Sequence, residues 1–180
     1  MKVKSVLSIV LVAFFLFNCK KNKPIDSLEV ITPKPILSNN RIVFDLIVPE
    51  DDIFQIFYTV DGTSNFNEEM SVRVNITGSN ENQSIVFEFP EDIFITRYRV
   101  DVGENTNQGT IKINKFTIHY FAKKFEIIGS DFFNYFTPTD QIEVVKDKSI
   151  IAPKKVGDTY DPLFYQTDNI LNAELEKIQN

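Results

Sequence analysis

The sequence predicts an all-β fold, a jelly-roll-like β-sandwich that ends in one short helix. Short apolar runs recur with the two-residue period of strands, and turn-forming residues separate them. The chain has 17 Phe but only 6 Gly, and aromatic and β-branched residues favour strands. From about Asn169 the period becomes helical, because Leu171, Leu175 and Ile178 form one apolar stripe after Asp168, a candidate N-cap.

Residues 1–18 follow the plan of a secretory signal peptide, with lysines before an apolar run shorter than the about 20 residues of a membrane-spanning helix. Cys19 follows directly and is the only cysteine, so an internal disulfide is excluded. The segment Leu16-Phe17-Asn18-Cys19 resembles the lipobox of bacterial lipoproteins, with Asn18 where Gly or Ala is usual. The resemblance implies cleavage before Cys19 and its acylation, for example with palmitate. The alternatives are an ordinary signal peptide and an uncleaved anchor helix.

The charge and the N-terminus together indicate a compartment. Loss of the signal peptide leaves 180 − 18 = 162 residues, enough for one domain. Two lysines leave with it, so the net charge moves from −6 to −8, which argues against nucleic acid as a partner. Two roles fit Lys20, Lys21 and Lys23: they can attract anionic lipid headgroups, or they can belong to a solvated tether. Such chains resemble lipoproteins of Bacteroidetes-like bacteria, and basic residues after Cys19 favour a periplasm-facing anchor in the outer membrane.

Residues 19–40 are predicted to form the lipidated cysteine and a tether, and residues 41–180 the sandwich domain. Prolines keep the tether extended and exclude a helix from it, while residues 27–32 fit a first edge strand. Further strands are predicted over residues 41–48, 53–60, 70–77 and 85–89. The run over 53–60 is apolar on both faces, as in a strand covered on both sides.

The stretch from 97 to 120 is predicted to form two long strands joined by a polar turn over 103–109. Its apolar side chains share one face up to Ile113 but the other face from Phe116 onward. A strand can change phase only by an irregularity, so the sequence predicts a β-bulge near Asn114, or two strands that meet at a corner.

Weaker patterns follow the central stretch. Residues 125–128 and 132–136 are apolar enough to pack on the sandwich, and 141–145 and 149–152 fit a hairpin across 146–148. About eight strands result, with no internal repeat and no second domain boundary.

Residues 53–120 carry a resemblance to a known module. Its parts are an aromatic strand (54–58), an acidic approach into an alternating strand (67–74), and the segments 99–103, 109–113 and 116–118. This pattern resembles a small β-sandwich module appended to bacterial membrane glycosyltransferases and other polysaccharide-associated proteins, and more broadly carbohydrate-binding modules. In that family the Arg-x-Asp segment usually continues with Pro-Gly, whereas Val102 replaces the proline here. The resemblance implies a glycan as ligand.

Three residues are candidates for ligand binding. Arg99 and Asp101 lie two apart on a strand, so both side chains leave the same face. A guanidinium and a carboxylate can each bind neighbouring sugar hydroxyls; alternatively the two pair with each other beside Gly103. Tyr58 is a candidate for stacking on a sugar ring, although such platforms usually include Trp and this chain has none. The alternative role of Tyr58 is core packing.

We expect no enzyme activity, cofactor or metal site. His119 is the only histidine, which excludes a histidine triad and a His-rich metal site, and its strand position predicts exposure. Acidic pairs such as Asp51-Asp52 fit solvated turns, because no spaced calcium loop accompanies them. Glycosidase chemistry needs two carboxylates across a cleft, and no pair is privileged in the sequence.

Two hypotheses for function result. The first is a non-catalytic, membrane-anchored envelope lipoprotein that binds a glycan or assists polysaccharide metabolism. The alternative is a structural or interaction lipoprotein whose sandwich docks an envelope protein. A concave polar and aromatic patch beside Arg99 and Asp101 would favour the first, and a flat apolar patch elsewhere the second.

Overall fold

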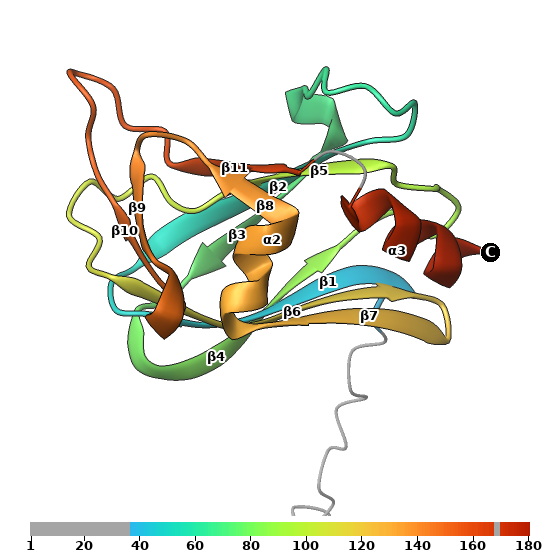
Figure 1. The fold of residues 1–180 in the computed structure, drawn as a ribbon, viewed down its shortest axis with the longest axis horizontal. Helices are drawn as coiled ribbons and strands as arrows, with labels where there is room; N and C mark the ends of the chain where they lie inside the picture. The colour runs from blue at the N-terminus through green and yellow to red at the C-terminus, as the bar shows by residue number, and fades with distance from the viewer. Residues whose placement is uncertain (1–36, 168–169) are drawn as a thin grey trace, which may run out of the picture. The chain divides into compact units, whose positions relative to one another are not determined.

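The computed structural model describes residues 37–167 and 170–180 (Figure 1). The predicted signal peptide, Cys19, most of the tether, the candidate edge strand over 27–32 and Asp168 lie outside these residues. Within the described ranges, no helix has the length and hydropathy needed to cross a membrane.

Eleven strands form two antiparallel sheets in the described part of the chain. The first sheet has the order β4-β1-β6-β10-β9, and β7 also pairs with β6. Its strands are β1 (Asn40–Val48), β4 (Ser79–Glu88), β6 (Ile111–Tyr120), β7 (Lys123–Ile128), β9 (Ile142–Val145) and β10 (Ile150–Pro153). The second sheet has the order β3-β2-β5-β11-β8. Its strands are β2 (Asp52–Thr59), β3 (Ser71–Ile76), β5 (Arg97–Asp101), β8 (Phe136–Pro138) and β11 (Leu163–Gln166).

The helical elements are short. Single 3₁₀ turns are η2 (Glu68–Met70), η3 (Gly129–Asp131) and η4 (Lys146–Lys148), and the α-helices are α2 (Phe132–Tyr135) and α3 (Ile170–Gln179). Helix α3 buries Leu171, Leu175 and Ile178, which confirms the predicted C-terminal helix and its apolar stripe. Figure 1 shows α2 and α3 beside the strands rather than in a layer of their own.

The core lies between the two sheets, because each strand turns one face of its pleat inward. Along β1 buried and half-buried side chains alternate without exception, as predicted for residues 41–48. Phe132 of α2 fills the centre, with its ring stacked 4.6 Å from Phe136 and 5.4 Å from Phe44. The predicted all-β sandwich with a short C-terminal helix is therefore confirmed.

The predicted bulge lies in β6. Asp45 of β1 pairs with Lys115 of β6, whereas the next residue, Leu46, pairs with Ile113. Asn114 is thus the extra residue, and it allows both Ile113 and Phe116 to point into the core.

Three features differ in detail from the sequence-based prediction. The two strands of the 97–120 stretch lie in different sheets, and the first, β5, has only five residues. The sequence predicts only that residues 125–128 and 132–136 pack on the sandwich; the first lie in strand β7, and residues 132–135 form α2. Strands β8 and β11 are three and four residues long, too short to show a period. The predicted late hairpin is confirmed as β9 and β10.

Candidate functional site

The candidate site lies on the outer face of the second sheet, where three central strands align their side chains. Arg99 of β5 pairs in register with Phe57 of β2 on one side and Tyr165 of β11 on the other. Residues directly opposite in an antiparallel pair share a face. These three side chains therefore point away from the core, while their neighbour Tyr98 points into it and is 1% exposed.

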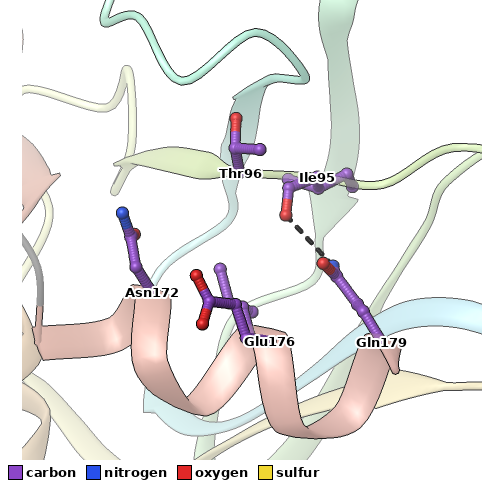
Figure 2. A pocket seen from close by; sticks show the side chains of 6 residues that line it. Ile95, Thr96, Asn172, Glu176 and Gln179 are labelled. Carbon is purple, nitrogen blue, oxygen red and sulfur yellow. Dashed lines mark hydrogen bonds between the residues drawn. The ribbon is translucent and has the colours of Figure 1, made fainter.

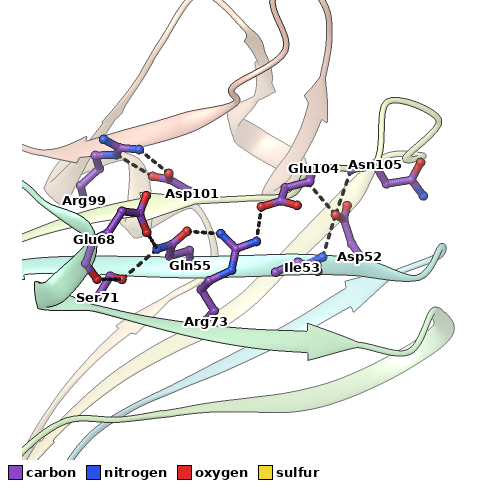
Figure 3. Close-up of polar contacts among 10 residues, drawn as sticks. All are labelled: Asp52, Ile53, Gln55, Glu68, Ser71, Arg73, Arg99, Asp101, Glu104 and Asn105. Atoms are coloured by element: carbon purple, nitrogen blue, oxygen red, sulfur yellow. Dashed lines mark hydrogen bonds and ion pairs between the residues drawn. The ribbon is translucent and has the colours of Figure 1, made fainter.

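Arg99 and Asp101 form the pair that the sequence brings to one face (Figure 3). Arg99 Nε donates to Asp101 Oδ1 at 2.8 Å, and Nη2 donates to Oδ2 at 2.5 Å. The guanidinium also lies 4.2 Å from the centre of the Phe57 ring, a cation–π contact. Burial raises the pKa of Asp101, and the bond to Arg99 offsets part of that rise. The same bond raises the pKa of Arg99, which stays charged.

A second set of polar side chains runs beside this pair (Figure 3). Gln55 of β2 donates to Glu68 of η2 and to Ser71, each at 2.8 Å, and its oxygen accepts from Arg73 at 2.8 Å. Arg73 in turn forms an ion pair with Glu104. Because these contacts join β2, β3, η2 and the loop after β5, they fix donors and acceptors from four segments around one space.

That space is a groove of about 380 Å³. Its lining includes both ion pairs, Phe57, which is 4% exposed beneath the Arg99 guanidinium, and Tyr160 and Asp161 from the segment before β11. The Tyr160 hydroxyl donates to the carbonyl of Asn105 at 2.8 Å, and burial, with a smaller contribution from Asp52, raises the pKa of Tyr160 to about 12. The groove therefore presents mainly polar groups, many of them held by hydrogen bonds to one another.

A smaller hollow of about 300 Å³ adds aromatic surface near Arg99. It is lined by Phe66 and Tyr165, whose ring centres are 6.3 Å apart. The Tyr165 side chain is 45% exposed, and its register partner is Arg99. The exposed Tyr165 ring, with the half-buried Phe66 ring beside it, thus stands next to the polar groove.

Asp52 holds the loop that forms one wall of the groove. It is 7% exposed, and its Oδ1 accepts from the backbone N–H groups of Ile53, Glu104 and Asn105 at 2.7–3.0 Å. Its Oδ2 accepts from Gln108 at 2.8 Å. The loop follows Gly103, which has φ +120° and no room for a Cβ, since one would lie 2.4 Å from Asp52 Oδ2. The acidic pair Asp51-Asp52 is thus partly structural, not merely a solvated turn.

The cavity under α3 is too small for a ligand of ordinary size. It has a volume of about 70 Å³, and Gln179 closes it by donating to the Ile95 carbonyl at 3.0 Å (Figure 2). That volume is far below the about 300–1,000 Å³ typical of ligand sites. Within residues 37–167 and 170–180, no three His, Cys, Asp or Glu side chains gather as they would around a metal ion.

The remaining predicted residues lie elsewhere. Tyr58 is 7% exposed and packs edge-on against Phe89 inside the sandwich, so it does not share the face of Arg99; its neighbour Phe57 does. Burial raises the pKa of Tyr58. His119 is half-buried, and its Nδ1 lies 3.5 Å from Arg41 Nη2; the strand position had predicted greater exposure.

Compared with known protein families, with curated proteins and with solved structures, the chain matches none. The site therefore has to be interpreted from its own geometry. Gln55, Glu68, Arg73 and Tyr165 belong to it, although no sequence pattern marked them as ligand-binding residues.

Proposed function

We propose that this protein is a non-catalytic bacterial envelope lipoprotein, anchored through Cys19, whose β-sandwich binds a glycan in the groove around Arg99 and Asp101. The observation that carries the proposal is the presence, on one sheet face, of two ion pairs next to the exposed Tyr165 ring and the half-buried Phe66 ring. Sugars present hydroxyl edges and apolar ring faces, and a site needs both kinds of surface to bind them.

The polar groups are prepared for hydroxyl recognition. Because Arg99 and Asp101 hold each other in place, neither loses much side-chain freedom when a ligand arrives. Charged donors and acceptors make hydrogen bonds about twice as strong as neutral ones. The chain has no Trp, so Tyr165 and Phe66 supply the aromatic surface on which a sugar ring can stack.

The charge of the groove favours neutral sugars. Four carboxylates line it, namely Glu68, Asp101, Glu104 and Asp161, against two guanidinium groups, Arg73 and Arg99. Each guanidinium is already paired with a carboxylate. An anionic sugar would therefore meet net repulsion, so we expect neutral or amine-bearing saccharides to bind better than uronic acids or phosphorylated glycans.

A glycan-array screen of the folded protein tests the proposal, with the double variant Arg99→Ala, Asp101→Ala beside it. Removing both partners leaves no unpaired charge behind, so the fold should survive. Lys112→Ala is the matched control, because Lys112 is exposed on β6 in the other sheet. We expect wild type and control to bind the same neutral glycans and the double variant to lose them.

The opposite result has a clear meaning. A folded wild-type protein that binds no glycan would refute the proposal and favour the alternative, a lipoprotein that docks an envelope protein. Binding that survives in the double variant would place the sugar outside this groove.

A further inference from the structure

We propose that an exposed aromatic cluster at the β6–β7 turn is a membrane-contact surface that rests on the headgroup region of the bilayer. We call this cluster the aromatic tip; it consists of Phe94, Tyr120 and Phe121. The proposal rests on the lipid anchor of the proposed function, but it is independent of glycan binding.

The aromatic tip gathers apolar surface where the domain has no use for it. The Phe94 ring lies 5.4 Å from the Tyr120 ring, which lies 5.0 Å from the Phe121 ring, measured between ring centres. Phe94 is 51% exposed and Phe121 50% exposed. Single exposed apolar residues need no explanation, but three contiguous aromatic rings mark a contact surface.

The backbone of Phe121 adopts a conformation that disfavours a bulky side chain. Phe121 has φ +51°, the left-handed region that suits Gly or Asn in a tight hairpin turn and costs a bulky residue about 1 kcal/mol or more. Phe121 nevertheless stands in this turn, half exposed, with no core position to justify the strain. Such an outlier points to a function for the side chain.

The chain enters the domain beside the tip. Phe121 N donates to the carbonyl of Asn39 at 2.9 Å, and Asn40 pairs with Tyr120. Leu37, the first described residue, is 39% exposed. It lies 18 positions after Cys19, so the anchor keeps the tip within about 65 Å of the bilayer. At the high effective concentration that such a tether imposes, a weak surface is enough to orient the domain.

The charges around the tip suit a headgroup region. Lys123 and Lys124 are exposed at the start of β7. Lys123 Nζ donates to the Lys177 carbonyl at 3.4 Å, and Lys124 forms an ion pair with Glu126 at 3.2 Å. On a membrane, lipid phosphates would take the place of these exposed partners while the rings lie deeper. Glu91 and Asp92 are exposed in the segment before Phe94. Because the surface is mixed in charge, we expect the apolar contact to contribute more than the attraction to anionic lipid.

This contact would direct the groove toward the aqueous side. The loop that follows Asp101 connects to the start of β6, and Tyr120 is the last of the ten residues of that strand. A strand of that length spans about 30 Å. The groove wall at Glu104 and Asn105 thus lies at the opposite end of the sandwich from the aromatic tip, and a tip that rests on lipid leaves the groove open to large ligands.

The test measures the depth of a fluorescent label in the bilayer. The full-length protein, purified from a lipoprotein-processing host, is bound to vesicles of phosphatidylethanolamine and phosphatidylglycerol that contain brominated lipid. One variant carries Ala122→Cys at the tip and a matched control carries Asn107→Cys in the loop before β6; both positions are exposed. Acylated Cys19 does not react, so each variant takes an environment-sensitive thiol label at one position.

We expect brominated lipid to quench the label at position 122 and not the label at 107. Adding Phe94→Ser and Phe121→Ser should remove the quenching at 122, and circular dichroism should show an intact fold, since both side chains are half exposed. Equal quenching at both positions, or quenching at 122 that survives the double replacement, would overturn the membrane-contact surface.

Mass spectrometry of the Cys19 peptide separates the two possible failures. Acylated, vesicle-bound protein without quenching at 122 overturns the surface and leaves the anchor in place. Protein without acyl groups that also fails to bind vesicles overturns both.

Discussion

Replacing Asp52 tests whether one buried carboxylate holds the wall of the groove. Asp52→Ala removes the acceptor of three backbone N–H groups and of the Gln108 side chain. Hydrogen bonds to a charged acceptor contribute about 1.5–3 kcal/mol each. Water can replace the lost hydrogen bond to the backbone N–H of Glu104, because Glu104 is exposed. We therefore expect a loss of about 3 kcal/mol in the free energy of unfolding, the equivalent of two such bonds at the lower limit.

Asp52→Asn is the matched control. Its side-chain oxygen can still accept from the three backbone N–H groups, and only the Gln108 donor then meets an amide N–H instead of an oxygen. Because neutral acceptors are weaker than charged ones, we expect a smaller loss of about 1–2 kcal/mol. Urea unfolding followed by circular dichroism measures both values. Equal losses for the two variants, or a loss below about 0.5 kcal/mol for Asp52→Ala, would refute the role assigned to Asp52.

Three further predictions concern stability. Gly103→Ala should lower the free energy of unfolding by about 2 kcal/mol or more, because its Cβ would collide with Asp52. Gly157→Ala should lower it by only about 1 kcal/mol, because Gly157 has a positive φ but open space around it. Equal losses in thermal unfolding would contradict the collision. Phe132→Ala should cost about 3–5 kcal/mol in urea unfolding, since it leaves a cavity where a fully buried ring stacked; a loss under about 1 kcal/mol would contradict its central place in the core. Burial lowers the pKa of His119, and the charges of Arg41 and Lys124 lower it further, so the folded state favours the neutral imidazole. The stability that this group contributes is present above the unfolded pKa of about 6.5, and it is lost as the pH falls through the lower pKa of the folded state. His119→Gln should flatten this slope of unfolding free energy against pH, and an unchanged slope would assign it to other groups.

The strands that the sequence predicts correctly are long enough to show a pattern. In β1 every second side chain is buried, so periodicity defines it, and β2 was recognisable as a run that is apolar on both faces. The bulge at Asn114 was predictable for the same reason, because a change of phase has few structural causes. Strands β8 and β11 gave no such pattern, since three or four residues are too few to show a period.

The site was predictable only where its residues are neighbours in sequence. Arg99 and Asp101 share a face because they are two apart. The sequence names Tyr58 as the aromatic candidate, but it cannot tell which of Tyr58 and Phe57 faces outward, because β2 is apolar on both faces. The pairing of β2 with β5 decides which side chain faces outward, since Tyr58 lies opposite the inward-pointing Tyr98 and Phe57 lies opposite Arg99.

The other groove residues depend on long-range register. Tyr165 reaches Arg99 through the pairing of β11 with β5, and Arg73 reaches Gln55 through the pairing of β3 with β2. A single sequence does not encode such pairings in any local pattern.

The central claim is that the groove around Arg99 binds a saccharide, and a nuclear magnetic resonance titration tests it most directly. Neutral oligosaccharides released from bacterial envelope polysaccharide are added to isotope-labelled protein, and backbone amide shifts are followed. We predict that the largest shifts fall on Gln55, Arg99 and Tyr165, and that Arg99→Ala, Asp101→Ala abolishes them. Shifts confined to other faces of the sandwich, or no shifts with any neutral oligosaccharide, would contradict the claim.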